Sequence, residues 1–154
     1  MHGKKADFFT IVFMLAALAA AGCLVTSGSD ALSQSAATVI AIAQMEVGKP
    51  PGGFRFARTG QGGPSQWRVV DDPTSFEGRV IEQSSSDRAD YRFPLAILES
   101  IVAKNVEVSL SFKPVAGQVD QAGGIAVRVA DADNYYGVRA NALEDNVRFY
   151  RVAK

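Results

Sequence analysis

The chain has 154 residues, and its 16 lysine and arginine residues equal its 16 aspartate and glutamate residues in number. The formal net charge at pH 7 is therefore zero, which excludes a global positive field that would favour nucleic acid or an anionic membrane surface as the partner. Cys23 is the only cysteine, so an intrachain disulfide is excluded and the fold must be stabilised by packing alone.

Residues 1–23 have the three-part layout of a bacterial export signal. Lys4 and Lys5 form a cationic start, and an apolar run covers residues 8–21 before the small residues that lead to Cys23. This run of 14 residues is shorter than the roughly 20 that a membrane-spanning helix requires. We therefore expect a cleaved signal helix rather than a permanent span.

Residues 20–23 resemble a lipoprotein box, in which the cysteine thiol receives diacylglycerol. The resemblance predicts lipidation of Cys23. The alternative is cleavage by an ordinary signal peptidase, which leaves Cys23 without a role. In either case we expect an exported protein that is periplasmic, secreted or lipid-anchored at the outer surface, and that contacts the membrane only through its signal or lipid anchor.

The remainder of the chain divides near residue 45. Residues 24–44 predict a flexible tether, because most of the segment is rich in serine, alanine and glycine and lacks an apolar period. Within it, residues 39–43 are more apolar and either open the first strand or extend the signal. Residues 45–154 then form one folded domain, expected to be a β-sandwich.

The pattern of residues 45–154 predicts an all-β, antiparallel fold. Short β-branched and aromatic runs alternate with clusters of glycine, proline, aspartate and asparagine, and no stretch has a convincing helical period. The turn residues 71–74 indicate a hairpin between the strands on either side. The expected strands cover residues 52–56, 66–70, 78–83, 92–98, 106–112, 123–130 and 135–140, with a further strand after residue 146.

Residues 106–112 show the clearest alternation in the chain. Successive side chains of a strand point to opposite faces of the sheet, so one face of this strand is apolar and the other is polar. We expect the apolar set to line the core and the polar set to contact water. The apolar set is Val106, Val108, Leu110 and Phe112, and the polar set is Glu107, Ser109 and Ser111.

Residues 131–134 predict a four-residue loop that joins two paired strands. If Ala130 pairs with Tyr135, then Val127, Val129, Tyr136 and Val138 share the face expected to be the core. A second hairpin through residues 141–146 would pair Ala140 with Val147 and Val138 with Phe149. The opposite, outer face then carries three arginines and two tyrosines, namely Arg128, Arg139, Arg148, Tyr135 and Tyr150.

This outer face is the predicted ligand-binding surface. Tyrosine rings stack on sugar rings, and arginine guanidinium groups donate forked hydrogen bonds to hydroxyl or carboxylate oxygens. The alternative is a solvated face whose arginines pair with acids such as Glu107, Asp120 or Glu144, each pair contributing about 0–1 kcal/mol. Trp67 has the same two interpretations, as a sugar-stacking ring or as a core residue.

Asp131, Asp133 and Asn134 place three oxygen-bearing side chains in one short loop, which is the chemistry that calcium prefers. The alternative is a plain turn, since the other ligands of a calcium-binding loop are missing. The only histidine, His2, lies in the predicted signal, so Ser-His-Asp catalysis, Cys-His catalysis and the usual zinc sites are excluded for the mature chain. No cofactor is implied.

Three sequence segments resemble a known family. They are VDQAGG at residues 119–124, DADNYY at residues 131–136 and RANALEDNVR at residues 139–148. Together they are similar to the laminin G-like and 3-keto-disaccharide hydrolase-type domains of bacterial exported proteins. The resemblance is strongest over residues 106–152 and weaker over residues 53–67 and 71–83. It implies a jelly-roll β-sandwich of the concanavalin A-like class.

The chain departs from this family in two respects. Family 16 glycoside hydrolases carry Glu-x-Asp-x-Glu on a strand, so that alternate carboxyl groups point into one cleft, and that spacing is missing here. Family domains also continue well past the point that corresponds to Lys154. We therefore expect residues 45–154 to be the N-terminal portion of an incomplete sandwich, whose last strand is an open edge.

These observations predict an extracytoplasmic, carbohydrate-associated module that binds glycans, without nucleic acid as a partner. One alternative is a glycoside hydrolase of the 3-keto-disaccharide type, with Glu107, Asp120 or Glu144 as its acid. The other alternative is a structural interaction domain.

Overall fold

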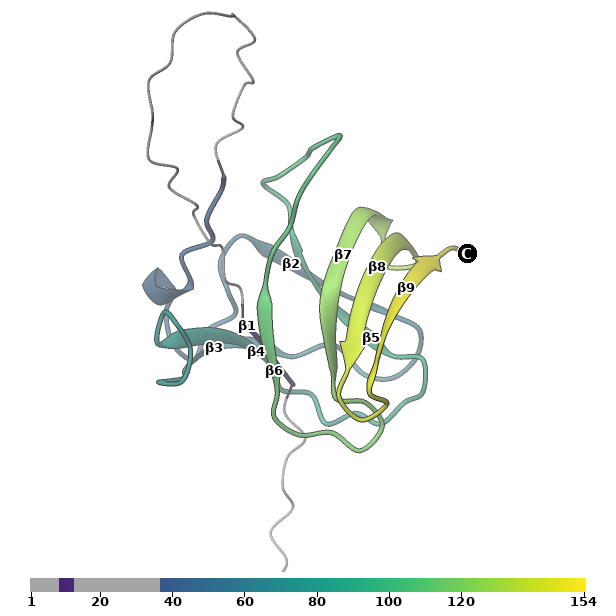
Figure 1. The fold of residues 1–154 in the computed structure, drawn as a ribbon, viewed down its shortest axis with the longest axis horizontal. Coiled ribbons are helices and arrows are strands. Elements are labelled where there is room, and N and C mark those ends of the chain that lie inside the picture. The colour runs from purple at the N-terminus through teal and green to yellow at the C-terminus, as the bar shows by residue number, and fades with distance from the viewer. Residues whose placement is uncertain (1–8, 13–36) are drawn as a thin grey trace, which may run out of the picture.

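A computed structural model describes residues 9–12 and 37–154 of the chain (Figure 1). Its regular structure consists of antiparallel strands and one short 3₁₀ helix, η1 (Ile42–Gln44), which confirms the all-β prediction. No helix within the described part of the chain has the length and apolar character needed to cross a membrane. The predicted signal and Cys23 lie outside the described residues, except for residues 9–12.

The strands form three sheets. The first has the order β3-β4-β1-β6 and contains β1 (Phe9–Val12), β3 (Trp67–Asp71), β4 (Arg79–Gln83) and β6 (Ser111–Pro114). In this sheet β1 lies between β4 and β6 and pairs antiparallel with both. The hairpin predicted around residues 71–74 is confirmed by the pairing of β3 with β4.

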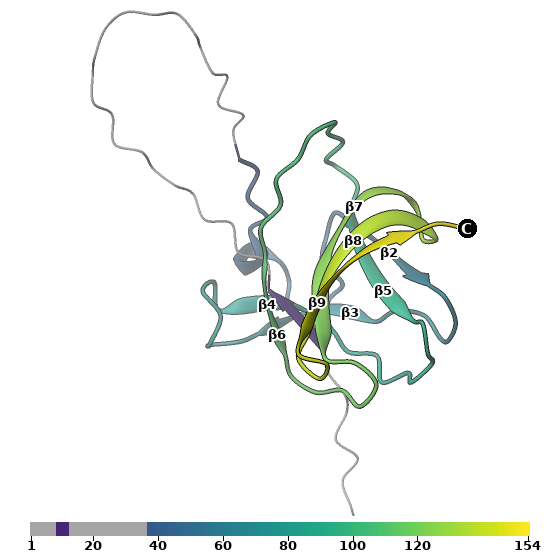
Figure 2. The same cartoon turned by 45° about the vertical axis from the view of Figure 1, so that its right-hand side comes forward.

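The second and third sheets face each other. The second pairs β2 (Phe54–Thr59) with β5 (Phe93–Leu98), and the third has the order β7-β8-β9, with β7 (Ala122–Asp131), β8 (Asn134–Asn141) and β9 (Asn146–Val152). The strands β2 and β5 run along one face of the third sheet in both ribbon views (Figures 1 and 2). The first sheet lies beside the second and third sheets. Its strands β3 and β4 contribute residues that border the space between those two sheets.

The best-packed core lies where η1 contacts the first sheet. Ile42 is fully buried against Trp67, Val69 and Ile81, with Phe54 and Phe56 packed at the margin of this cluster. The core therefore includes a residue on the N-terminal side of the predicted boundary at residue 45. This apolar cluster fixes β3 and β4, which form one wall of the site described below.

The predicted strand over residues 106–112 is wrong for most of its length. Only residues from Ser111 onward are in a strand, and the valines predicted to be in the core are 52% exposed at Val106 and 39% exposed at Val108. A strand needs a neighbour to accept and donate its backbone hydrogen bonds. In the described part of the chain, no strand pairs with residues 106–110.

The ladder between β7 and β8 contains an irregularity that the sequence did not predict. Asp131 pairs with Asn134, the register shifts between Val127 and Asp131, and the predicted pair of Ala130 with Tyr135 is not formed. Arg128 lies within the shift and has a positive φ of 53°. Extra residues in one strand produce such a β-bulge, which locally bends the ladder.

The second hairpin follows the predicted register but presents the opposite face to the interior. Ala140 pairs with Val147 and Val138 pairs with Phe149, as predicted. The apolar face nevertheless points outward, with Val147 70% exposed and Phe149 69% exposed. The inward face is covered by β5 and by the segment that precedes it, so it is the polar face that is shielded from water.

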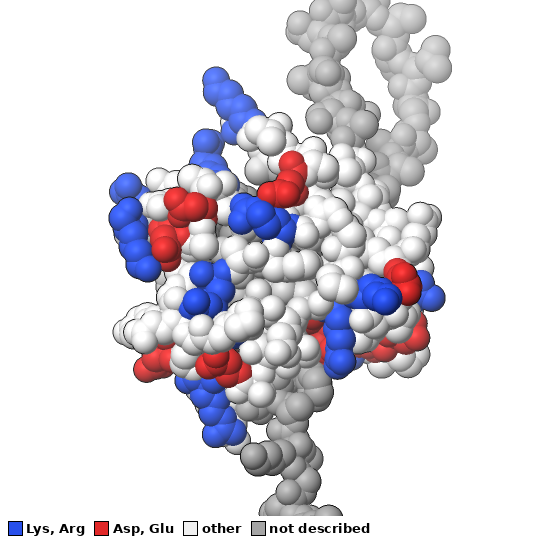
Figure 3. Space-filling view, turned by 180° about the vertical axis from the view of Figure 1, so that it is seen from behind, with Lys and Arg blue, Asp and Glu red and all other residues white. Residues whose placement is uncertain are grey.

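Charged side chains of both signs lie around the margin of the face seen from behind the molecule. Figure 3 shows lysine and arginine side chains interspersed with aspartate and glutamate side chains around an uncharged centre. One pair on the second sheet joins Arg55 and Glu99, whose Nε and Oε1 atoms are 2.6 Å apart. Both side chains are exposed, so the pair contributes at most about 1 kcal/mol to stability.

Replacing Ile42 with alanine is expected to lower the free energy of unfolding by about 2–5 kcal/mol, because the deletion leaves a cavity in a fully packed cluster. Denaturant unfolding of the full chain, followed by the fluorescence of Trp67, measures this change in the same core. The matched control is Val39→Ala, which shortens a half-exposed side chain and is expected to change stability by less than about 0.5 kcal/mol. Equal effects of the two substitutions would contradict the described core.

Candidate functional site

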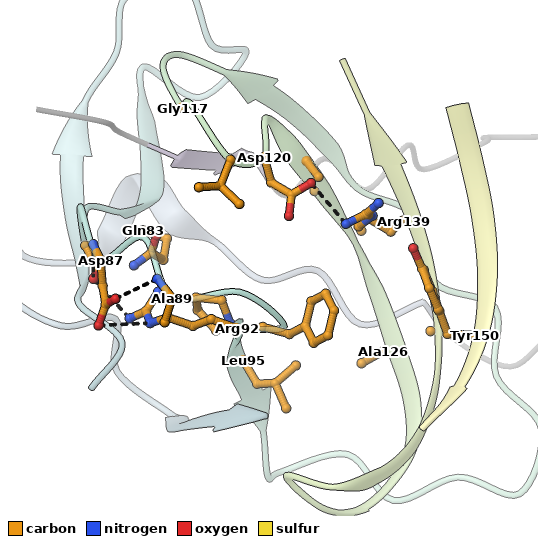
Figure 4. Close-up of a pocket in the computed structure, with 18 of the residues that line it drawn as sticks. Gln83, Asp87, Ala89, Arg92, Leu95, Gly117, Asp120, Ala126, Arg139 and Tyr150 are labelled. Atoms are coloured by element: carbon orange, nitrogen blue, oxygen red, sulfur yellow. Dashed lines mark hydrogen bonds and ion pairs between the residues drawn. The ribbon is translucent and has the colours of Figure 1, made fainter. Parts of the chain in front are cut away.

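A cavity of about 220 Å³ lies between the inward face of the third sheet and the first two sheets. Figure 4 shows Arg139 and Tyr150 on the β8–β9 side and Gln83 and Arg92 on the other side. Residues from six strands and two connecting segments line it, so the cavity exists only in the assembled fold. The polar and aromatic residues that matter for its chemistry are Trp67, Gln83, Arg92, Asp120, Arg139 and Tyr150.

Arg139 is the central residue of the β8–β9 wall. Its side chain is 16% exposed, and its Nη1 and Nη2 atoms donate to Asp120 Oδ1 at 3.2 Å and to Glu144 Oε2 at 2.8 Å. The guanidinium carbon lies 5.6 Å from the centre of the Tyr150 ring. A cation over an aromatic ring is stabilised by the negative face of the ring. These three contacts fix the direction in which the guanidinium points.

Asp120 connects this arginine to a buried asparagine. The side-chain amide of Asn141 donates to Asp120 Oδ1 at 2.6 Å, and Asn141 is only 2% exposed. The side-chain oxygen of Asn141, Oδ1, in turn accepts from the backbone N–H groups of Gln121 at 3.3 Å and Leu143 at 3.0 Å. Buried polar groups need such partners, so this network secures the end of the β7–β8–β9 sheet that borders the cavity.

Arg92 lies in the opposite wall, and its guanidinium donates hydrogen bonds to other residues of the chain. Its Nη2 donates to Pro64 O and to Ser85 Oγ, both at 3.0 Å, and its Nε lies 3.7 Å from Asp87 Oδ2. Desolvation lowers the pKa of the Arg92 guanidinium, whose side chain is 5% exposed. The pKa of Asp87 is lowered chiefly by the backbone N–H of Gly63. The Asp87 carboxyl group is therefore ionised at neutral pH.

Three residues that line the cavity each have a buried side-chain N–H donor without an acceptor among the described residues. The donors are the indole Nε1 of Trp67, the amide Nε2 of Gln83 and the Nε of Arg139. Trp67 and Gln83 are direct partners across β3 and β4, so their side chains share one face of the first sheet. A buried donor without an acceptor is costly, and these nitrogens lie within the walls, with no surface open to the cavity.

Aromatic rings provide the apolar part of the lining. The Tyr150 ring lies 6.4 Å from that of Phe93 in a tilted arrangement, and the Trp67 ring stacks on Phe56 at 6.4 Å. Tyr135 is buried, its hydroxyl oxygen is 3.0 Å from Thr59 Oγ1, and desolvation raises the pKa of the Tyr135 hydroxyl. Tyr135 is therefore a neutral, anchored wall residue.

The structure separates the five predicted ligand-binding residues into two groups. Tyr135, Arg139 and Tyr150 line the cavity, whereas Arg128 and Arg148 are exposed and lie outside its lining. The prediction that all five share a solvent-facing surface is wrong, because the face that carries Tyr135 and Arg139 is covered. At the bulge, Arg128 instead donates to the backbone carbonyl of Lys104 at 3.3 Å.

The candidate acids are also separated. Glu107 is exposed in the segment before β6, and Glu144 pairs with Arg139 from the loop after β8. The pKa of Glu144 is lowered, first by its hydrogen bond with Asn146, so this carboxyl group is ionised at neutral pH. Asp120 alone of the three lines the cavity.

The oxygen-rich loop between β7 and β8 has the geometry of a turn. Both carboxylate oxygens of Asp131 accept from the amide of Asn134, at 2.9 and 3.0 Å, and the backbone N–H of Asp133 donates to the same carboxylate at 2.8 Å. These bonds lower the pKa of Asp131. Among the described residues, no group of three or more histidine, cysteine or acidic side chains is arranged to hold a metal ion.

Sequence reasoning missed Gln83 and Arg92 as site residues. Gln83 ends an apolar strand and Arg92 begins another, and neither belongs to a local motif. The only sequence signal is indirect and concerns Gln83. The predicted pairing of residues 66–70 with residues 78–83 places Gln83 opposite Trp67. This pair and the β7–β8–β9 sheet line the same cavity, and that long-range arrangement has no counterpart in the sequence pattern.

Comparison with models of protein families, with curated proteins and with solved structures finds no match to this chain. The resemblance to laminin G-like and 3-keto-disaccharide hydrolase-type domains therefore stays a prediction.

Replacing Asp120 with alanine is expected to lower the free energy of unfolding by about 1–3 kcal/mol. The substitution leaves Arg139 Nη1 and the buried amide of Asn141 without their shared acceptor. Thermal or denaturant unfolding of the full chain measures the loss. Glu107→Ala is the matched control at an exposed acid, with an expected change below about 0.5 kcal/mol. An Asp120→Ala chain as stable as the control would show that the network does not support the fold.

Proposed function

We propose that this chain is a carbohydrate-associated β-sandwich module of the concanavalin A-like, jelly-roll class, which binds a glycan outside the cytoplasm. The observation that carries the proposal is one cavity whose lining combines the aromatic ring of Tyr150 with the polar side chains of Asp120 and Arg139. Sugar recognition needs an aromatic ring and polar groups together. The face of a sugar ring that carries C–H groups packs on an aromatic ring, and the sugar oxygens form hydrogen bonds with polar side chains.

The size of the cavity supports a single sugar ring as its occupant. An apolar cavity of about 150 Å³ in another protein takes up benzene, and the present cavity has about 220 Å³. That volume accommodates one six-membered ring with its substituents. Because the cavity is not fully enclosed, the ring can be the terminal unit of a longer chain.

Binding is favoured over hydrolysis by the state of the carboxyl groups. Glycoside hydrolysis uses two carboxyl groups across the bond, one with a raised pKa so that it can donate a proton. The pKa of Asp87 and that of Glu144 are both lowered, so neither is suited to act as the general acid. Asp120 is engaged by both Arg139 and Asn141.

Glycan-array binding by the full chain tests this function. Tyr150→Ala is expected to reduce binding at least tenfold, because it removes the ring that packs at the cavity and contacts Arg139. The matched control is Tyr136→Ala, an exposed tyrosine outside the cavity lining, with binding expected to be unchanged. Binding to no glycan would contradict the proposal, and release of a cleaved product would assign an enzyme instead.

We also propose that residues 1–23 direct export and that Cys23 is lipidated. Expression in a bacterial host is expected to give a mature chain that starts at Cys23 and fractionates with the membrane, as measured by intact mass and fractionation. Cys23→Ala should shift the chain to the soluble exported fraction. Cleavage would remove β1 from its position between β4 and β6. A chain that keeps residue 1 and stays in the cytoplasm would contradict this proposal.

A further inference from the structure

We propose that copies of this chain associate by strand addition, in which residues 106–109 of one copy pair with the free edge of β9 in another. Both segments have a strand-like pattern and an unpaired side in the described chain, and they complement each other in charge and in apolar pattern. The proposal goes beyond carbohydrate binding and does not depend on it.

β9 is an edge strand with an exposed apolar margin. It pairs with β8 on one side, and no strand of the described chain pairs with its other side. Its outward residues Val147 and Phe149 are 70% and 69% exposed, and the ring centres of Phe149 and Tyr136 are 6.1 Å apart. A free edge offers a row of backbone N–H and C=O groups to another strand. β9 can therefore accept an added strand, which would cover this apolar margin.

Residues 106–109 have the pattern of a strand without a neighbour. Their side chains alternate between apolar and polar, yet no strand of the described chain pairs with them. Val106 and Val108 lie on one side of the segment and are 52% and 39% exposed, and Glu107 on the other side is exposed as well. Exposed β-branched side chains and unpaired backbone groups both favour addition to a sheet. This segment is therefore suited to be the added strand.

The two segments of one copy lie at opposite edges of the third sheet. The segment that leads into β6 runs on the β7 side, where Arg128 donates to the backbone carbonyl of Lys104, and β9 is the far edge (Figure 1). Because β7 and β8 lie between the two segments, pairing requires a second copy. Each copy offers one segment and one edge, so the contact is heterologous and joins copies head to tail.

Charge favours residues 106–109 over a second β9 as the added strand. Residues 146–154 contain three cations and no acid, the cations being Arg148, Arg151 and Lys154. Two β9 strands paired with each other would gather the cations of both copies along one seam, and like charges across a ladder are destabilising. Residues 106–109 contain one acid, Glu107, and no cation. Their addition therefore brings opposite charges together.

The side chains of Glu107 and Arg148 are available to pair across the contact. Both are exposed, and in the part of the chain that the structure describes neither side chain forms a hydrogen bond or an ion pair. Glu144 lies near Arg148, but its carboxylate is held by Arg139 and Asn146. Glu107 of a second copy can therefore pair with Arg148.

The alternation selects one register. In an antiparallel pair, which is more stable per residue than a parallel one, residues opposite each other share a face. With Glu107 opposite Arg148, the two valines of the segment meet the two outward apolar residues of β9. The pairs are Val106 with Phe149 and Val108 with Val147. A shift by one residue would place the valines on the polar face, and a shift by two would move Glu107 away from Arg148.

Sedimentation velocity of the full chain over a series of concentrations measures the association. The chain carries Cys23→Ala, so that neither a lipid anchor nor a disulfide between copies can cause it. Replacing Val106 and Val108 together with serine is expected to weaken the association at least tenfold, because apolar area is removed from the contact. The matched control is Val102→Ser, at a 98% exposed valine of the same connecting segment, with association expected to be unchanged. Melting curves establish that each variant is folded.

A charge exchange tests the register. Glu107→Arg and Arg148→Glu, each alone, place like charges opposite each other and are expected to weaken the association at least threefold. Mixed in equal amounts, the two variants are expected to associate as the parent chain does, because each offers the charge that the other lacks. Such a restoration on mixing requires contact between different copies.

A chain that stays monomeric at every concentration would overturn the proposal. Single charge reversals that associate as the parent chain does, or a mixture that stays as weak as its components, would overturn it as well. The same holds if the serine pair associates no more weakly than Val102→Ser, since the contact would then lie elsewhere. Glycan binding is measured separately, so the failure of one proposal is distinguishable from the failure of the other.

Discussion

The burial of Arg139 on the inward face of β8 is the constraint on which the site depends. An arginine side chain that is only 16% exposed needs acceptors for its guanidinium. Asp120, which precedes β7, and Glu144, which follows β8, supply them. Because a buried cation without partners would be strongly destabilising, these acids and the arginine are required together. The network in turn holds Asn141 and the neighbouring backbone. A polar face can therefore point inward in a sheet whose opposite face is apolar.

The cavity follows from the meeting of two differently built walls. The β3–β4 wall is secured by apolar packing around Ile42, and the β8–β9 wall by hydrogen bonds and ion pairs around Asp120. Neither wall forms the cavity alone, because residues of both walls line it. Their juxtaposition places Trp67 and Gln83 across from Arg139, so the chemistry of the site is a product of long-range assembly.

The sequence predicted the local features well. The hairpins through residues 71–74 and 141–146 are present, as are the pairs Ala140 with Val147 and Val138 with Phe149, because a tight connection and period-two alternation are encoded within a few residues. The choice of the inward face was wrong, since it depends on which distant segment covers the sheet. Likewise, the alternation over residues 106–112 is strand-like, but no strand in the described chain pairs with residues 106–110. The bulge at Arg128 adds residues that alternation alone does not reveal.

The donors that the protein leaves unsatisfied also bear on how such a site evolves. Each buried N–H without an acceptor costs about 1–3 kcal/mol of folding free energy, so a substitution that supplied an internal acceptor next to Trp67, Gln83 or Arg139 would make the fold more robust. Because these nitrogens lie within the walls and have no surface open to the cavity, such a substitution would leave the groups that line the cavity in place. Natural proteins are rarely at their stability optimum, so the walls can gain stability without a change in the cavity that they enclose.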